Sequence, residues 1–317
     1  MKGWLALPLF VSTLPLAMWM LAAREPVGDT VYRIRHDVDL VLLEVSVTDP
    51  KGGFVSGLTG ANFRIYEDGE EQQMRLFATE DMPASVGIVI DISGSMRSKR
   101  SEVVAAALAF ARASHPRNEM FVINFNERVR MGLPAGILFT QNMQQLRSAL
   151  NAHQTDGSTA LYDAVAEGLE HLRKGRLERK VILLISDGGD NSSSHTLDEV
   201  IEMAQRSTAT IYTIGLFDKH DNFSNPTVLK KLSEVTGGEA FLPQALKDVV
   251  KVGEQIATDI RNRYTLGYAP TNAEFDGKPR SIRVTVSKDN GEALNVRTRT
   301  SYIAVPRRPA AREDDTI

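Results

Sequence analysis

The sequence predicts an α/β fold, in which a three-layer α/β domain is inserted into a β-sandwich formed by both chain ends. Two observations lead to this expectation. From residue 86 onward, short apolar runs alternate with helical patterns, which is typical of a mostly parallel sheet covered by helices on both faces. On either side of that stretch the chain shows strand patterns, and neither β region is long enough to bury a good core alone.

The first β region is expected over residues 30–82. It opens with a strand at residues 38–48, where apolar residues such as Leu43 and Val45 alternate with polar ones, so one face is buried. A turn follows at residues 49–53. Residues 63–77 then read as a hairpin around Asp68-Gly69, a dipeptide that favours tight turns.

The α/β domain is expected over residues 84–262. Its strands are predicted at residues 86–91, 120–125, 129–133, 181–187, 210–216 and 240–242. Its helices are predicted at residues 97–113, 142–151, 160–173, 197–206, 226–234 and 246–263. The short strand near Val129 is expected to be an antiparallel edge strand.

The second β region is expected over residues 263–305. One strand is predicted at residues 264–270, and residues 280–286 and 294–300 read as a hairpin around a turn at residues 289–291. Residues 306–317 are short, charged and contain proline, so we expect a disordered tail.

Composition narrows the classes of function. The chain has 317 residues and a formal net charge of −3, which gives no global reason to expect nucleic acid as a partner. It contains no cysteine, which excludes disulfides, thiolate metal sites and a cysteine nucleophile.

The amino-terminal segment indicates export. After Lys2, residues 3–23 carry no charge and are rich in Leu, Met, Ala and Trp. That apolar length reaches the roughly 20 residues that span a bilayer. We therefore expect residues 1–23 to be a signal peptide or a membrane anchor, and the protein to be periplasmic, membrane-anchored or secreted.

Oxygen-bearing side chains gather where the first buried strand of the α/β domain ends. Asp91, Ser93 and Ser95 occupy every second position there, and a helical pattern begins near Met96. Open α/β sheets bind ligands in such crevices. One carboxylate and two hydroxyls suit a hard cation that keeps open positions, above all Mg²⁺.

Two later segments add further oxygens. Thr159 lies in the polar loop Gly157-Ser158-Thr159 just before a helical pattern, and Asp187 ends another buried-strand pattern. With these segments the chain resembles the von Willebrand factor type A family, whose metal-ion-dependent adhesion site reads Asp-x-Ser-x-Ser, then Thr, then Asp. The resemblance implies a Rossmann-like domain and metal ligation by five residues, namely Asp91, Ser93, Ser95, Thr159 and Asp187.

The resemblance also implies a function. A type A domain with this site holds Mg²⁺, with Mn²⁺ or Ca²⁺ as alternatives, and binds a protein or surface glycoconjugate that offers a carboxylate. The expected function is therefore divalent-cation-dependent adhesion at the bacterial cell envelope, without catalysis.

The β regions resemble a bacterial set of type A domain proteins common in acidobacteria. The shared motifs are the leading strand at residues 38–49, the Tyr-Glu-Asp-Gly hairpin at residues 66–69, and Tyr-x-Leu-Gly-Tyr-x-Pro at residues 264–270. This resemblance supports the split β region and bacterial export, and it implies no particular activity.

Two other functions stay open. A Mg²⁺-dependent hydrolase would need a base near the metal, for which Asp163 and His195 are the nearby candidates. In a structural assembly module the metal would only stiffen the fold.

Several polar residues near the site also have two readings. Asp163 could instead be a first-turn residue favoured by the helix dipole. Asp190 with Asn191 could form a second cation site or merely a polar surface loop. Arg97, Lys99 and Arg100 could form a positive rim that attracts acidic partners, or an ordinary solvated helix face.

Overall fold

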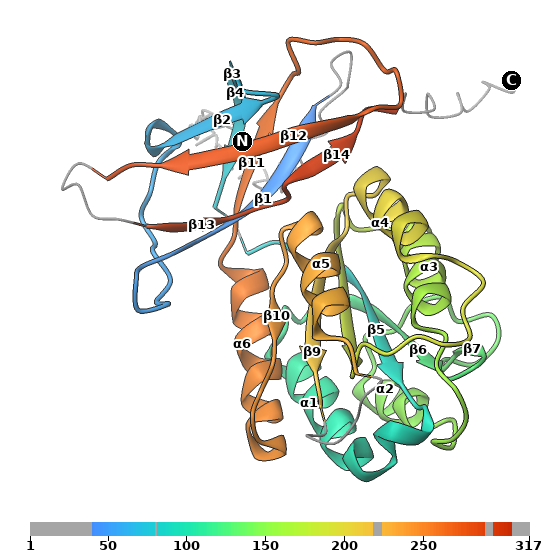
Figure 1. Cartoon of the computed structure of the whole chain (residues 1–317). Coiled ribbons are helices and arrows are strands. Elements are labelled where there is room, and N and C mark those ends of the chain that lie inside the picture. Colours follow the sequence, from blue (N-terminus) through green and yellow to red (C-terminus); the bar gives the residue numbers. More distant parts are fainter. Residues whose placement is uncertain (1–39, 80, 218–223, 289–293, 306–317) are drawn as a thin grey trace, which may run out of the picture. The chain divides into compact units, whose positions relative to one another are not determined.

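The computed structural model describes residues 40–79, 81–217, 224–288 and 294–305, and Figure 1 shows their course. The expected signal peptide or anchor (residues 1–23), the tail (306–317) and the turn at residues 289–291 lie outside the described residues. Within the described part of the chain, no helix is both long and apolar enough to cross a membrane.

A six-stranded sheet forms the centre of the α/β domain, in the order β10-β9-β8-β5-β6-β7. Its strands are β5 (Ala84–Asp91), β6 (Glu119–Phe125), β7 (Val129–Met131), β8 (Arg179–Ser186), β9 (Thr210–Gly215) and β10 (Ala240–Phe241). All neighbours are parallel except β6 and β7, so the expected antiparallel edge strand is confirmed. Every residue of β5, β6 and β9 is buried, which explains why these strands are rich in apolar residues on both faces.

Helices cover both faces of this sheet (Figure 1). One layer contains α1 (Arg100–Ala113), α2 (Met143–Leu150) and α6 (Val249–Arg261). The other contains α3 (Leu161–Leu172), α4 (Leu197–Arg206) and α5 (Pro226–Thr236). Their starts follow local chemistry, since Asn142, Thr196 and Asn225 each accept a backbone N–H at the N-cap. The predicted α/β fold class is confirmed.

Two predicted helices begin later than the sequence indicated. Gly94–Lys99 and Leu246–Asp248 form short 3₁₀ segments, η2 and η3, which lead into α1 and α6. In η2 the tighter winding follows directly from the turn after β5, where the backbone N–H of Met96 donates to the carbonyl of Ser93.

The remaining strands form two four-stranded sheets, each mixing strands from both β regions. One sheet has the order β13-β1-β11-β4 and the other β14-β12-β2-β3. The first β region supplies β1 (Val41–Thr48), η1 (Gly60–Asn62), β2 (Phe63–Glu67), β3 (Glu70–Gln72) and β4 (Met74–Ala78). The second supplies β11 (Tyr264–Tyr268), β12 (Pro279–Val286), β13 (Asn295–Arg297) and β14 (Ser301–Ile303). Side chains from both sheets share one apolar core, as a sandwich requires.

Both predicted hairpins are only partly right. The Asp68-Gly69 turn is present, with both residues at positive φ, and it joins β2 to β3. The return strand then changes sheets, because β4 pairs with β11 instead of continuing along β2. The predicted pairing of residues 280–286 with 294–300 is also displaced: β13, within 294–300, pairs with β1, and β12 pairs with β14, which lies just beyond that segment.

A buried carboxylate lies in the sandwich core. Glu67 forms an ion pair with Arg280 at 3.0 Å and accepts hydrogen bonds from the hydroxyls of Tyr268 at 2.6 Å and Tyr302 at 2.9 Å. Glu67 belongs to the Tyr-Glu-Asp-Gly motif and Tyr268 to the Tyr-x-Leu-Gly-Tyr motif. These motifs therefore serve the core of the sandwich, where the carboxylate is fully paired.

A second buried carboxylate, Asp259 in the last turn of α6, joins strands of two sheets. Its oxygens accept hydrogen bonds from Ser46 of β1 at 2.7 Å and from the hydroxyl of Tyr212 of β9. They also pair with the guanidinium groups of Arg263 at 3.2 Å and Arg297 at 2.9 Å. Burial alone would raise the pKa of this carboxyl, but the two arginines outweigh it and lower the pKa to about 2.

Candidate metal site

Three loops meet at the carboxyl end of the central sheet. Asp91 is the last residue of β5, and Ser93 and Ser95 lie in the turn and η2 that follow. Asp187 comes directly after β8, and Thr159 lies two residues before α3. Since β5 and β8 are adjacent and parallel, their ends place Asp91 and Asp187 together.

Asp91 lies fully buried behind the site. One carboxylate oxygen accepts the backbone N–H of Ser93 at 2.8 Å, and the other accepts the hydroxyl of Ser186 at 2.7 Å. Burial, followed by the charge of Asp187, raises the pKa of Asp91 to about 6, against the lowering effect of these hydrogen bonds. An ionised Asp91 is therefore only partly compensated by its neutral partners.

The other oxygens form a chain in front of Asp91. The hydroxyls of Ser93 and Ser95 are 3.2 Å apart, and Ser95 donates to Asp187 Oδ2 at 2.5 Å. The second oxygen of Asp187 accepts the backbone N–H of Gly189 at 3.1 Å. Three oxygen-bearing side chains that follow two strand ends thus lie in one hydrogen-bonded chain, next to Asp91.

Thr159 is fixed by the loop that follows β8. Its backbone N–H donates to the side-chain oxygen of Asn191 at 2.9 Å, and its carbonyl accepts the N–H groups of Asn191 and Ser192, both at 3.0 Å. No pattern in the sequence predicts this role of Asn191 or the contact of Ser186 with Asp91. Both depend on which loops meet in space.

An open cleft of about 210 Å³ is the meeting point of these loops. The residues lining it are Ser93, Ser95, Gly157, Ser158, Thr159, Asp187, Gly189, Asp190 and Asn191. Four of the five predicted ligands therefore face one cleft, and the fifth, Asp91, lies beneath it.

Two glycines let the loops approach one another. Gly157 has φ +83°, and a Cβ there would lie 1.9 Å from a carboxylate oxygen of Glu127. Gly188 has φ +80°, and a Cβ there would lie 2.3 Å from the carbonyl oxygen of Asn225. A larger residue at Gly188 would have to displace the backbone at Asn225, whereas at Gly157 the positive φ itself disfavours one, because the end of the Glu127 side chain can move aside.

The donor set fits a small hard cation. Oxygens at about 2.1 Å from Mg²⁺ in an octahedron lie about 3 Å from one another. The 3.2 Å between the hydroxyl oxygens of Ser93 and Ser95 is close to this spacing. The 2.5 Å between Ser95 and Asp187 is shorter, because a hydrogen bond now joins these two oxygens.

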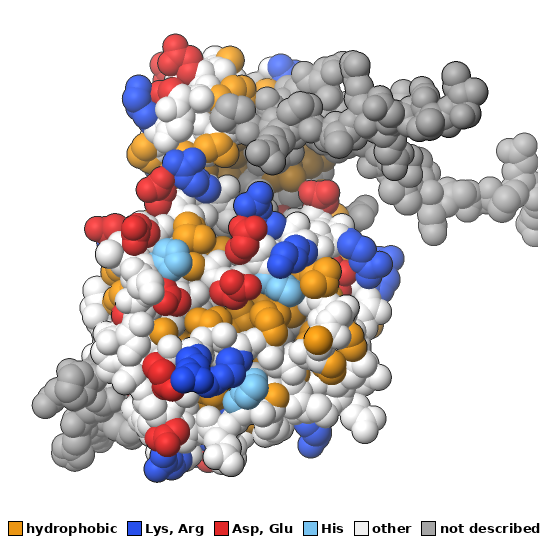
Figure 2. Space-filling view, turned by 90° about the vertical axis from the view of Figure 1, so that its right-hand side faces the viewer, with side chains coloured by type: hydrophobic (Ala, Val, Ile, Leu, Met, Phe, Trp, Pro, Cys, Tyr) orange, Lys and Arg blue, Asp and Glu red, His pale blue; other side chains and the backbone are white. Residues whose placement is uncertain are grey.

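The hypothesis of a positive rim is wrong for two of its three residues. Lys99 is 1% exposed, and its ammonium donates to the carbonyl of Leu216 at 2.8 Å. Arg100 donates to the carbonyl of Leu150 and is partly buried. Only Arg97 is on the surface, where it forms an ion pair with Asp156 at 3.0 Å. On the face shown in Figure 2, basic and acidic side chains are interspersed.

Asp163 and His195 bind each other instead of lining the cleft. The His195 ring nitrogen Nδ1 lies 2.7 Å from Asp163, which also accepts the backbone N–H groups of Ser194 and His195, both at 2.9 Å. Slight burial would raise the pKa of Asp163, but these hydrogen bonds lower it. Asp163 lies in the first turn of α3, as one of its two readings expected, and from there it organises the neighbouring loop.

Asp190 also serves this loop, since its carboxylate accepts the hydroxyl of Ser193 at 2.5 Å and the N–H of Tyr162 at 3.3 Å. Among the described residues, no group of three or more His, Cys, Asp or Glu side chains could hold a metal ion. The contacts that Asp190 makes within the loop favour its reading as part of a polar surface loop.

Comparison with known proteins agrees with this geometry. Residues 86–189 match the family model of the von Willebrand factor type A domain. This match covers all five predicted ligands of the type A domain. The central sheet with helices on both faces is the fold of that domain, and the two smaller sheets are additions to it.

A solved von Willebrand factor type A protein from Catenulispora acidiphila has a TM-score of 0.52 with this chain. It is 13% identical, and the likeness covers 84% of this chain and 74% of that chain. The type A domain of a type V pilus tip protein from Porphyromonas gingivalis is 14% identical, with a TM-score of 0.47, over 58% of this chain and 96% of that chain. At these identities the likeness concerns the fold alone.

Among curated proteins, a probable bifunctional E2/E3 enzyme of Acanthamoeba polyphaga mimivirus is 27% identical over 139 residues. That alignment covers 40% of this chain, and the chain spans about a tenth of the relative's length.

Proposed function

We propose that the chain is a cation-dependent binding module of the bacterial cell envelope. Asp91, Ser93, Ser95, Thr159 and Asp187 would hold one Mg²⁺, or Mn²⁺ or Ca²⁺ in its place. A protein or surface glycoconjugate would then bind through a carboxylate. The observation that carries this proposal is the group of hydroxyl and carboxylate oxygens around one small, open cleft at the carboxyl end of the sheet.

Charge favours an anionic partner. The five residues offer two carboxylates and three neutral hydroxyls, so a bound divalent cation would leave the site near neutral and able to accept another negative oxygen. When bound, the cation supplies a Lewis acid for that oxygen. The cleft opens to solvent and is lined by small or polar residues, which leaves room for an incoming carboxylate.

The match to the type A domain supports binding over catalysis, because domains of this family generally mediate protein–protein interactions. The positions of Asp163 and His195 also support binding over catalysis. The two side chains bind each other and are absent from the residues that line the cleft, so neither is placed to activate a water molecule there.

Export is part of the same proposal and rests on the uncharged run at residues 3–23. Fusing residues 1–40 to a reporter that is active only outside the cytoplasm should give activity. An expressed but silent reporter would refute export.

Calorimetric titration of the purified chain with Mg²⁺ tests the metal assignment. We expect one ion per chain and a rise in thermal midpoint with Mg²⁺ concentration, since the ion binds only the folded state. Asp91→Asn should abolish both effects, because it removes a charged ligand. Asp156→Asn, outside the ligand set and exposed, is the control and should keep them. Equal Mg²⁺ binding by the Asp91 variant would refute the assignment.

A pull-down from envelope extract, with Mg²⁺ and with chelator, then tests the binding function. A partner captured equally well without metal would favour the structural assembly module, in which the cation only stiffens the fold.

A further inference from the structure

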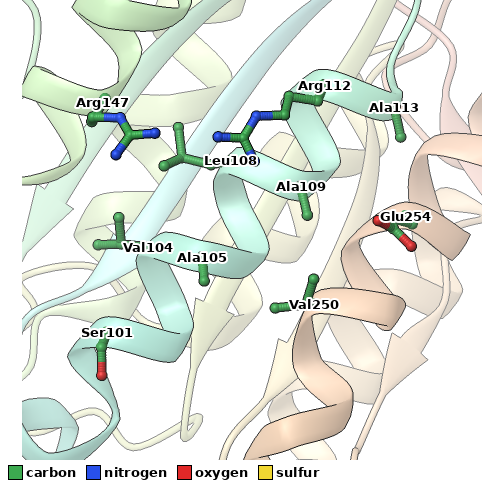
Figure 3. Close-up of a pocket in the computed structure, with 10 residues that line it drawn as sticks. All are labelled: Ser101, Val104, Ala105, Leu108, Ala109, Arg112, Ala113, Arg147, Val250 and Glu254. Atoms are coloured by element: carbon green, nitrogen blue, oxygen red, sulfur yellow. The ribbon is translucent and has the colours of Figure 1, made fainter.

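A second surface of the α/β domain has the features of a binding site. An open groove of about 630 Å³ runs along the outer face of α1, between α2 and α6 (Figure 3). Its floor is apolar, with Val104, Ala105, Leu108 and Ala109 of α1, and Val250 of α6 stands 36% exposed on one wall. The groove shares no lining residue with the metal cleft.

The shape of the groove follows from small residues at helical spacing. Ala105, Ala109 and Ala113 succeed one another every fourth residue, so this row of α1 has no large side chain. Gly253 brings α6 close, since a Cβ there would lie 2.6 Å from the carbonyl oxygen of Ala106. From Ser101 to Ala113 the groove is about 18 Å long, which matches a helix of about 12 residues.

The charges of the groove indicate which partner fits. Arg112 of α1 and Arg147 of α2 are both exposed, and Figure 3 shows their guanidinium groups on either side of Leu108. Among the described residues, neither arginine forms an ion pair with an acidic side chain. Glu254 stands on the α6 wall (Figure 3). An apolar floor beside two like charges from different helices is complementary to an apolar ligand that carries acidic groups.

We propose that this groove binds an amphipathic helix of a partner protein. The apolar face of that helix would rest on the alanine row and against Val250, and its carboxylates would meet Arg112 and Arg147. Helices recognised in this way present apolar residues at i, i+4 and i+7, which is the spacing that the groove offers. The apolar residues of the floor are recessed between walls, which suits a convex helix better than a flat lipid surface.

A synthetic peptide of about 14 residues is the probe. It carries Leu at i, i+4, i+7 and i+11, two Glu on one flank and one Lys on the other. Fluorescence anisotropy with the full chain should give a dissociation constant on the order of 10–100 μM, typical of a small interface. Ala105→Trp should abolish binding, because the indole would fill the groove at an exposed position that tolerates it.

Charge reversal distinguishes this site from non-specific adsorption. The double variant Arg112→Glu/Arg147→Glu should weaken binding about tenfold or more, and a peptide with Lys in place of its two Glu should bind that variant better than the original chain. Arg75→Glu/Arg117→Glu, at exposed positions outside the groove, is the matched control and should bind as the original chain does.

Three outcomes would overturn the proposal. These are binding of the Lys peptide to the original chain as tightly as the Glu peptide, binding that Ala105→Trp leaves intact, and no binding of the Glu peptide. Vesicles of anionic lipid that compete with the peptide through the same arginines would assign the surface to a membrane instead.

Discussion

Buried acids occur in two kinds of surroundings in this chain, and the difference separates structure from function. Glu67 and Asp259 are each paired with arginine, and the arginines lower the pKa of Asp259 to about 2. Asp91 receives its hydrogen bonds from a hydroxyl and a backbone N–H, both neutral, and burial raises its pKa to about 6. The first kind is already neutralised within the fold, whereas the second is suited to an added cation.

The largest effect is expected for Glu67→Ala. The substitution leaves the buried Arg280 without its carboxylate and removes the acceptor of two tyrosine hydroxyls, so it should lower the free energy of unfolding by about 3–5 kcal/mol. Urea denaturation measures this loss. Glu71→Ala is the control, because Glu71 is an exposed partner of Arg64 and should change stability by less than about 1 kcal/mol. A similar loss of unfolding free energy in both variants would contradict a structural role for the buried Glu67.

Asp259→Asn should show a dependence on pH. Because the pKa of Asp259 lies at about 2 in the folded chain, against roughly 3.9 when unfolded, its charge contributes about 2–3 kcal/mol at neutral pH. That contribution is present above pH 4 and is lost as the pH falls towards 2. The unfolding free energies of variant and original chain should therefore converge below pH 4. Asp198→Asn is the control, because the side chain of Asp198 is 90% exposed. Its unfolding free energy should follow that of the original chain at every pH.

Asn191→Ala tests the positioning of Thr159. The substitution removes the oxygen that accepts the Thr159 N–H and should weaken Mg²⁺ binding about tenfold, as is usual for a residue that holds a metal ligand in place. Stability without metal should change little, because the loop is exposed. Mg²⁺ affinity is measured by calorimetric titration. Ser194→Ala in the same loop is the control and should leave that affinity unchanged. If Mg²⁺ affinity is unchanged, Thr159 is held by other contacts or does not ligate.

Without metal, Asp91→Asn should raise the free energy of unfolding, whereas Glu67→Ala should lower it. Burial, and then the neighbouring charge of Asp187, disfavours the ionised form of Asp91. Replacing it with a neutral amide removes both costs, so thermal unfolding near pH 7.5 in chelator should show a stabilisation on the order of 1 kcal/mol. The amide oxygen can still accept the N–H of Ser93. A clear destabilisation would mean that Asp91 is a structural acid like Glu67 and is not held in the fold for an added cation.

Much of the α/β domain could be predicted, because its central strands, such as β5 and β8, are buried on both faces and are therefore rich in apolar residues. The ends of those strands also fixed where Asp91 and Asp187 would lie, since parallel neighbours end on the same edge. The exchange of strands between the two small sheets could not be predicted. The residues after Gln72 continue the local strand pattern, and only a distant partner, β11, decides which sheet β4 joins.

The surroundings of the site were harder to predict than its ligands. Nothing local distinguishes the buried Lys99 from the exposed Arg97, because both are basic residues of the same short segment η2. Their difference depends on the carbonyl of Leu216, which lies far along the chain. The same holds for Asn191, whose role appears only when its loop meets Thr159.

The pairing of β4 with β11 has a consequence for how the chain folds. Ala78 and Thr265 lie opposite each other in the ladder of β4 and β11, yet the entire α/β domain separates them along the chain. Closing so long a loop while it is disordered is slow and costs entropy. Once the inserted domain has folded, its two ends are held at a fixed separation. The flexible chain that must be closed between β4 and β11 is then only a few residues long. We therefore expect the α/β domain to fold first during synthesis, and the sandwich to assemble last, on a template that its own insertion provides.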